Sequence, residues 1–131
     1  VAAAAGVLYL EIRTAGVRTE AQVTLERRAA LVLEWVSRDL RSAQLRPPDR
    51  GEWVRFTQDG QTIVYRNEGD ALFRTTRTPS NENRRLLSRY AKALHVAPDD
   101  GGFRATVRMA RHLRRGRWVK LERRTFIGRR R

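Results

Sequence analysis

The spacing of apolar residues predicts one long helix in the first third of the chain. Apolar positions recur three or four residues apart over residues 25–43, which places them on one helix face; they are Leu25, Ala29, Val32, Val36, Leu40 and Ala43. No proline precedes Pro47, and between Gly16 and Gly51 there is no glycine. We therefore expect a helix from about Ala2 to Ala43, on the order of 60 Å long, which Pro47 and Pro48 terminate.

The N-terminal half of this predicted helix is apolar on several sides. Residues 1–10 carry no charge, and Val7, Leu8, Leu10, Ile12 and Val17 form the face that we expect to mediate helix–helix assembly. Lipid or a partner helix is expected to cover such a surface. The apolar stretch is shorter than the roughly 20 residues that cross a bilayer. We interpret it as the end of a membrane anchor.

Short segments rich in β-branched and aromatic residues follow the helix and predict antiparallel strands. The expected strands are residues 53–57, 62–66, 71–75, 103–109 and 118–127, with glycine-containing turns at 58–60, 67–70 and 99–102. Residues 76–83 are polar and contain Pro79, which favours a loop, whereas residues 84–96 fit either a helix or a strand beginning at Arg85. The expected fold is α+β, one long N-terminal helix packed on an antiparallel sheet, with a helical segment 1–46, a sheet head 47–128 and a basic tail 129–131.

Charge is distributed unevenly along the 131 residues, which suit one domain. Residues 1–70 hold 10 basic and 10 acidic side chains, whereas residues 71–131 hold 18 basic and 4 acidic ones and so carry the entire net charge of +14. All but two of the basic residues, Lys92 and Lys120, are arginines. A basic surface attracts polyanions, but a general preference for arginine in the genome would produce the same composition, and both explanations stay open.

One group of arginines is a candidate polyanion-binding site, because guanidinium groups bind phosphates well. It comprises Arg111, Arg114, Arg115, Arg117, Arg123 and Arg124. Trp118 lies next to the group and either stacks on a base or is buried. No recognised nucleic-acid-binding motif accompanies it, so a solvated hairpin face is the alternative.

Catalytic and metal-binding patterns are missing from the sequence. The chain has no cysteine, and its two histidines, His95 and His112, stand in no metal-binding spacing. Residues 99–102, Asp-Asp-Gly-Gly, fit a turn better than a calcium site, which needs more carboxylates at fixed spacing. We expect neither an enzyme nor a cofactor.

Two segments resemble the minor pseudopilins. Residues 30–43, ALVLEWVSRDLRSA, resemble the "L..L..DLR.A" end of the long helix of that family. Residues 63–66, IVYR, and 69–74, GDALFR, resemble its "I.Y......L.R" hairpin. The chain is most similar to the J-type minor pseudopilin of type II secretion and the W-type minor pilin of type IV pili.

This resemblance implies a pilin-like fold and a structural subunit that helps to initiate or cap a filament. Such a precursor is cleaved by a prepilin peptidase and methylated, and it spans the bacterial inner membrane once, with its head in the periplasm or on an extracellular filament. Its partners are other minor and major pseudopilins or pilins, and the membrane through its anchor. The alternatives are a DNA-binding minor pilin in DNA uptake and a free-standing basic polyanion-binding protein, so nucleic acid is a further possible partner.

Overall fold

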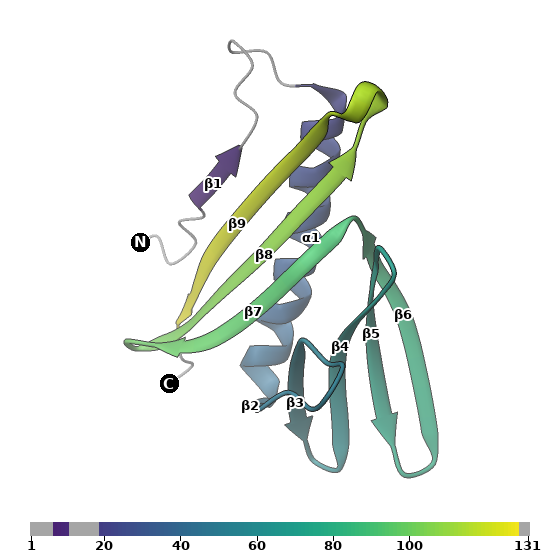
Figure 1. The fold of residues 1–131 in the computed structure, drawn as a ribbon. Coiled ribbons are helices and arrows are strands. Elements are labelled where there is room, and N and C mark those ends of the chain that lie inside the picture. Colours follow the sequence, from purple (N-terminus) through teal and green to yellow (C-terminus); the bar gives the residue numbers. More distant parts are fainter. Residues whose placement is uncertain (1–6, 11–18, 129–131) are drawn as a thin grey trace.

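The computed structural model describes residues 7–10 and 19–128, which form an α-helix and two antiparallel sheets (Figure 1). Sheet A has the strand order β1-β9-β8-β7, and sheet B has the order β2-β3-β4-β5-β6. The elements are β1 (Val7–Leu10), α1 (Glu20–Ser42), β2 (Gln44–Arg46), β3 (Val54–Gln58), β4 (Gln61–Glu68), β5 (Ala71–Thr78), β6 (Asn81–Arg89), β7 (Ala91–Asp99), β8 (Gly102–His112), the short 3-10 helix η1 (Arg114–Gly116) and β9 (Trp118–Gly128). The fold is therefore α+β, as the sequence predicted, but the strands form two antiparallel sheets and not the single sheet that was expected.

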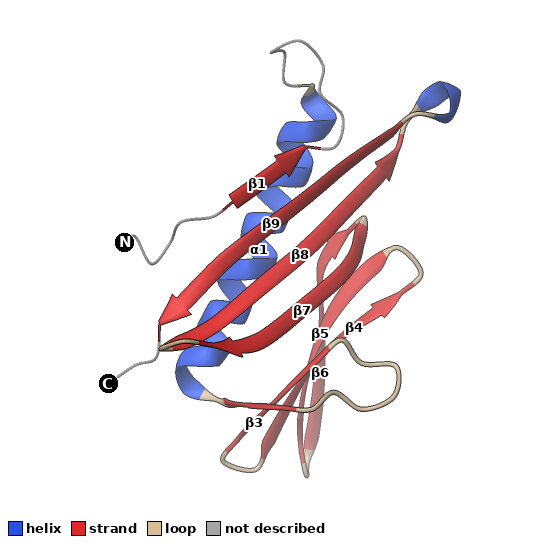
Figure 2. Ribbon diagram, turned by 60° about the vertical axis from the view of Figure 1, so that its left-hand side comes forward, coloured by secondary structure: helices blue, strands red, loops and turns tan. Residues whose placement is uncertain are grey.

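Sheet A runs along the length of α1, and sheet B meets the C-terminal half of the helix (Figure 1). Turning the molecule shows sheet A crossing in front of α1 (Figure 2). The apolar stripe predicted for the helix faces both sheets, because Leu25, Ala29, Val32 and Val36 are fully buried, and Leu40 and Ala43 pack at the margin of the core. The stripe is therefore core, as expected for an amphipathic helix on a sheet.

The predicted helix is too long at its N-terminal side. A capping box fixes the observed start: the Gln22 backbone N–H donates to Thr19 Oγ1 at 3.2 Å, and the Thr19 N–H donates to Gln22 Oε1 at 2.8 Å. This reciprocal pair satisfies two backbone donors that the first helical turn leaves open. The motif Thr-x-x-Gln was readable in the sequence, and it marks Glu20 as the first helical residue.

The N-terminal apolar segment includes a strand where the sequence analysis expected helix. β1 pairs antiparallel with β9, from Val7 opposite Arg124 to Leu10 opposite Leu121. A four-residue apolar run does not distinguish strand from helix by itself, and the free edge of β9 decides the outcome. Val7, Leu8 and Leu10 therefore do not share a helix face, while Ile12 and Val17, like residues 1–6 and the tail 129–131, lie outside the described residues.

The helix ends before the two prolines that were expected to stop it. The Ala43 N–H donates to the Asp39 carbonyl at 2.7 Å, and Ala43 itself is extended. The chain then enters β2, which pairs with β3 within the segment assigned to the helix by sequence. The helix therefore ends within one residue of its predicted end at about Ala43, and residues 44–46 of the predicted helical segment form a strand.

The ambiguous region after Thr76 consists of strands. β5 continues to Thr78, and residues 81–99 form β6 and β7 in place of the expected loop and the possible helix. Tyr90 joins the two strands with a positive φ of 69°. Its N–H donates to the Asp70 carbonyl at 2.6 Å, and its carbonyl accepts from the Ala110 N–H at 2.9 Å, so this residue links sheet B to sheet A.

Candidate functional site

The residues that carry the family resemblance meet in one buried cluster between α1 and sheet B. Asp39, from the Asp-Leu-Arg element, accepts a hydrogen bond from the Tyr65 hydroxyl of β4. Arg74 of β5 binds the same carboxylate with two donors, Nε to Oδ2 at 2.9 Å and Nη2 to Oδ1 at 2.6 Å. Asp39 is 4% exposed and Tyr65 is fully buried. A bidentate arginine–carboxylate pair of this kind combines charge with fixed geometry.

Arginines also surround the indole ring of Trp35, one helical turn before Asp39. The guanidinium carbons of Arg74, Arg85 and Arg38 lie 4.7, 4.9 and 5.3 Å from the ring centroid. Such cation–π contacts strengthen as they lose water. Trp35 therefore extends the contact between helix and sheet outward from the buried ion pair.

The protonation of this cluster favours a structural role. Burial, and then the negative charge of Asp39, raise the pKa of Tyr65 far above its ordinary value, so its hydroxyl stays protonated and donates. Burial alone would lower the pKa of Arg74, but the hydrogen bonds to Asp39 and its charge raise that pKa on balance. The cluster is thus a neutralised, buried ion pair with a phenol donor, and it fastens α1 to the β4–β5 hairpin.

Three of the six predicted polyanion-binding arginines lie together at the apex of the β8–β9 hairpin. Arg114, Arg115 and Arg117 are exposed on and beside η1, and none has an ion pair with a described residue. The turn is closed by the Leu113 N–H, which donates to the Arg117 carbonyl at 2.7 Å. Arg115 and Gly116 adopt positive φ values of 63° and 68°, which reverse the chain within this short distance.

The other three arginines point elsewhere. Arg111 lies on the α1 side of sheet A, with its guanidinium carbon 5.3 Å from the Tyr90 ring centroid. Arg123 pairs in register with buried Val107, so it also lies on the α1 side, whereas its neighbour Arg124 lies on the opposite face and contacts Glu122 at 3.2 Å. Alternation along a strand separates consecutive residues in this way.

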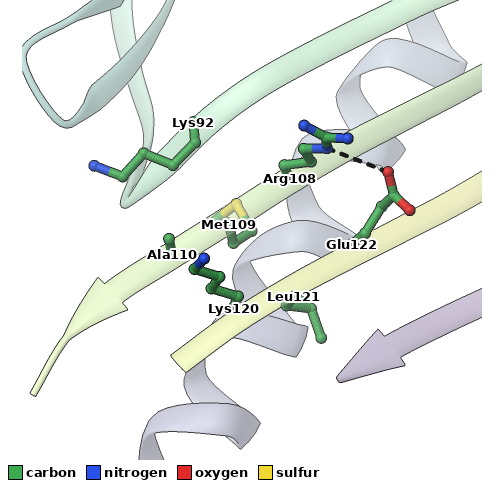
Figure 3. Close-up of a pocket in the computed structure, with 7 residues that line it drawn as sticks. All are labelled: Lys92, Arg108, Met109, Ala110, Lys120, Leu121 and Glu122. Atoms are coloured by element: carbon green, nitrogen blue, oxygen red, sulfur yellow. Dashed lines mark hydrogen bonds and ion pairs between the residues drawn. The ribbon is translucent and has the colours of Figure 1, made fainter. Parts of the chain in front are cut away.

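A concavity on the outer face of sheet A was not anticipated from the sequence. It has a volume of about 440 Å³ and is lined by residues of β7, β8 and β9, namely Lys92, Arg108, Met109, Ala110, Lys120, Leu121 and Glu122. Figure 3 shows the Lys92 and Lys120 side chains on either side of Ala110, with Arg108 bonded to Glu122 at 3.3 Å. The small side chain of Ala110 leaves the floor low between the two lysines.

The sequence contained one hint of this site, since Lys92 and Lys120 are the only lysines among 28 basic residues. The two lysines lie near each other because of a strand irregularity that the sequence does not predict. The register of β7 against β8 shifts between Ala91 and Ala93, and Lys92 occupies that bulge. Bulges re-aim side chains and commonly border functional surfaces.

The described part of the chain holds neither a metal-binding cluster nor a helix that could span a membrane. In that part of the chain no group of three or more His, Asp or Glu side chains could hold a metal ion. His95 and His112 belong to different strands, and His112 packs edge-on against Trp118 with ring centroids 4.9 Å apart. Over the same residues, no helix combines the length and apolar character of a membrane span.

Comparison with protein-family models, with curated proteins and with solved structures finds no match to this chain.

Proposed function

We propose that this chain is the head of a pilin-like filament subunit, a minor pseudopilin or minor pilin that helps to initiate or cap a type II secretion or type IV pilus-like filament. One observation carries the proposal. The segments that carry the resemblance are far apart in sequence, yet they bind one another. Asp39 of the helix contacts Tyr65 and Arg74 of the hairpin. A chance likeness of two short segments would not require the segments to form one interaction.

The second face of α1 suits such a role. While one side of the helix is core, the opposite side exposes residues at helical spacing, including Arg27, Leu31, Glu34 and Arg38. Leu31 is 43% exposed, one of three large apolar side chains exposed to this degree among the described residues. In a filament the sheets would cover one face of the helix, and neighbouring subunits would contact the other.

In this proposal the subunit is anchored in the bacterial inner membrane by a span that precedes Val1, and its head lies in the periplasm or on the filament. It acts by assembly with other minor and major subunits and not as an enzyme. Support for the nonenzymatic role comes from the motif residues themselves, since Asp39, Tyr65 and Arg74 saturate one another in the core.

Two measurements on the native protein test the proposal. Mass spectrometry of material from the source cell envelope should find a methylated N-terminal residue upstream of Val1, followed by an apolar span of roughly 20 residues. A photo-crosslinking amino acid at Leu31 should capture other filament subunits, whereas the same group at Val64, on the outer face of sheet B, serves as the control. An unmodified soluble protein starting near Val1, with equal crosslinking at both positions, would overturn the proposal.

A further inference from the structure

A continuous basic surface runs from the apex of the β8–β9 hairpin down the outer face of sheet A. We name it the basic track and define it by Lys92, Arg108, Arg114, Arg115, Arg117, Trp118 and Lys120. The even-numbered residues of β8 and β9 face away from α1, because the odd-numbered Val107, Met109, Val119 and Leu121 are buried beneath the sheet. Track residues from separate strands thereby come to share one surface.

The strand register orders the track. His112 lies opposite Trp118, Ala110 opposite Lys120, and Arg108 opposite Glu122. These pairs alternate with pairs that face the core, so successive residue pairs on the outer face are about 7 Å apart. A ligand lying along β9 would pass from the arginine apex over the indole of Trp118 to the concavity between the two lysines.

The three arginines at the apex of the track, Arg114, Arg115 and Arg117, have no ion pair with a described residue. On the outer face of sheet B, Glu82 pairs with Arg77 at 2.6 Å, Glu52 with Arg55 at 2.8 Å, and Glu68 with Arg84. In sheet A, Glu122 is bound by Arg108 at 3.3 Å and Arg124 at 3.2 Å, and Asp99 pairs with Arg104 at 2.8 Å.

Trp118 adds an aromatic surface to this charge. Its side chain is 42% exposed even though it lies in a regular strand, and His112 contacts it edge-on at an interplanar angle of 70°. The indole therefore lies beside Arg117, and Lys120 is the next residue of β9 on the same face. A large part of the indole surface is open to solvent. Positive charge combined with exposed aromatic rings is typical of surfaces that bind unpaired bases.

We propose that the basic track binds single-stranded nucleic acid, with phosphates at the arginine apex and the lysine concavity and a base stacked on Trp118. Unpaired bases present the faces that stacking requires, whereas a duplex hides them within its own stack. An acidic protein surface would satisfy the cations but would leave Trp118 without a role. The proposal does not depend on filament assembly.

The test uses the whole chain and a fluorescein-labelled oligothymidylate of about 20 nucleotides, with binding followed by fluorescence anisotropy. We expect a dissociation constant in the micromolar range at low salt and a steep loss of affinity as salt is raised. Substituting Arg114→Gln, Arg115→Gln and Arg117→Gln together should weaken binding at least about tenfold and lower the salt slope by about 2. Lys92→Gln with Lys120→Gln should weaken binding about fivefold.

A charge-matched control separates the track from net charge. Arg27→Gln, Arg41→Gln and Arg50→Gln remove three exposed arginines outside the track and should change the affinity less than twofold. At the stacking position, Trp118→Leu should weaken binding about fivefold or more, the effect of losing about 1 kcal/mol of stacking, while Trp118→Phe should stay within about twofold. Circular dichroism of each variant verifies that it is folded.

Three results would overturn the proposal. The first is equal affinity for the oligothymidylate and for a duplex of the same length, which would mean that only backbone charge is recognised. The second is displacement of the oligonucleotide by polyglutamate at equal charge concentration, which would assign the track to acidic protein. The third is an equal loss of affinity in the control triple variant, which would indicate no localised site.

Discussion

Asp39 and Arg74 form a bidentate ion pair across 35 positions of sequence, at 2.6 and 2.9 Å. Asp39 lies in the last turn of α1 and Arg74 in the middle of β5, and their side chains are 5% and 14% exposed. Because the pair is largely withdrawn from water, neither partner tolerates loss of the other. It therefore fixes the end of the helix against sheet B more specifically than apolar packing alone would.

Replacing Asp39 by Asn should destabilise the protein by about 3–5 kcal/mol, since the substitution leaves the Arg74 charge buried without its counter-ion. Urea unfolding followed by circular dichroism measures the loss. Glu34→Gln on the same helix is the matched control, because the Glu34–Arg38 pair at 2.9 Å is exposed and should contribute less than about 0.5 kcal/mol. Equal losses in the two variants would show that the buried pair contributes no more to the free energy of unfolding than the exposed pair.

Removing the Tyr65 hydroxyl should cost less than removing the carboxylate. In Tyr65→Phe the ring keeps its edge-on contact with Phe56 at 6.0 Å, but Asp39 loses one donor, so we expect a loss of about 1.5–3 kcal/mol. Tyr90→Phe provides the comparison, since the ring contacts of Tyr90 with Arg28 and Arg111 do not need its hydroxyl. Thermal unfolding of the two variants should therefore separate them clearly, and coincident curves would contradict the assigned hydrogen bond.

Two facing glycines at the end of the β8–β9 pair should respond differently to alanine. A Cβ on Gly102 would lie 2.2 Å from the Ile127 carbonyl oxygen and 2.9 Å from Gly128 Cα, both of them backbone atoms that cannot move aside cheaply. We expect Gly102→Ala to destabilise by about 1–3 kcal/mol or more. A Cβ on Gly128 meets only a Phe126 ring carbon at 4.0 Å, so Gly128→Ala should be neutral or slightly stabilising in the same unfolding experiment.

The stability of the head should fall at acid pH partly through Glu52. Hydrogen bonds from Arg55 lower the pKa of this carboxyl below its ordinary value of 4.5, and its side chain is 4% exposed. A group whose pKa is lower in the folded state stabilises the protein above its unfolded pKa, and that contribution disappears as the pH falls through the folded pKa. Glu52→Gln should therefore flatten the decline in unfolding free energy below about pH 4.5, measured by urea titration at a series of pH values. Parallel curves for wild type and variant would contradict this assignment.

The helix boundaries show where reasoning from the sequence succeeded and where it failed. The buried face of α1 was predicted residue by residue from Leu25 to Val36, because burial on one side imposes a helical period on apolar residues. The start at Glu20 was also encoded locally, in the capping pair of Thr19 and Gln22, but the apolar run before it concealed the boundary.

The existence of the strands was likewise predicted better than their ends. Residues 53–57, 62–66 and 71–75 were identified from composition and turns, and the structure lengthens the hairpin strands to Glu68 and Thr78. Polar β6 escaped prediction because it is an edge strand whose side chains from Asn81 to Leu86 are exposed, so no apolar alternation marks it.

Sequence alone determined the α+β class, the buried stripe of the helix and the concentration of positive charge in the second half of the chain. These properties follow from local period and composition. Tertiary structure alone decided that β1 joins sheet A, that Asp39 meets Tyr65 and Arg74, and that Lys92 faces Lys120 across Ala110. Each of these depends on which strand edges meet and on which register or bulge they adopt, and strand pairing links residues whose separation in sequence has no fixed period.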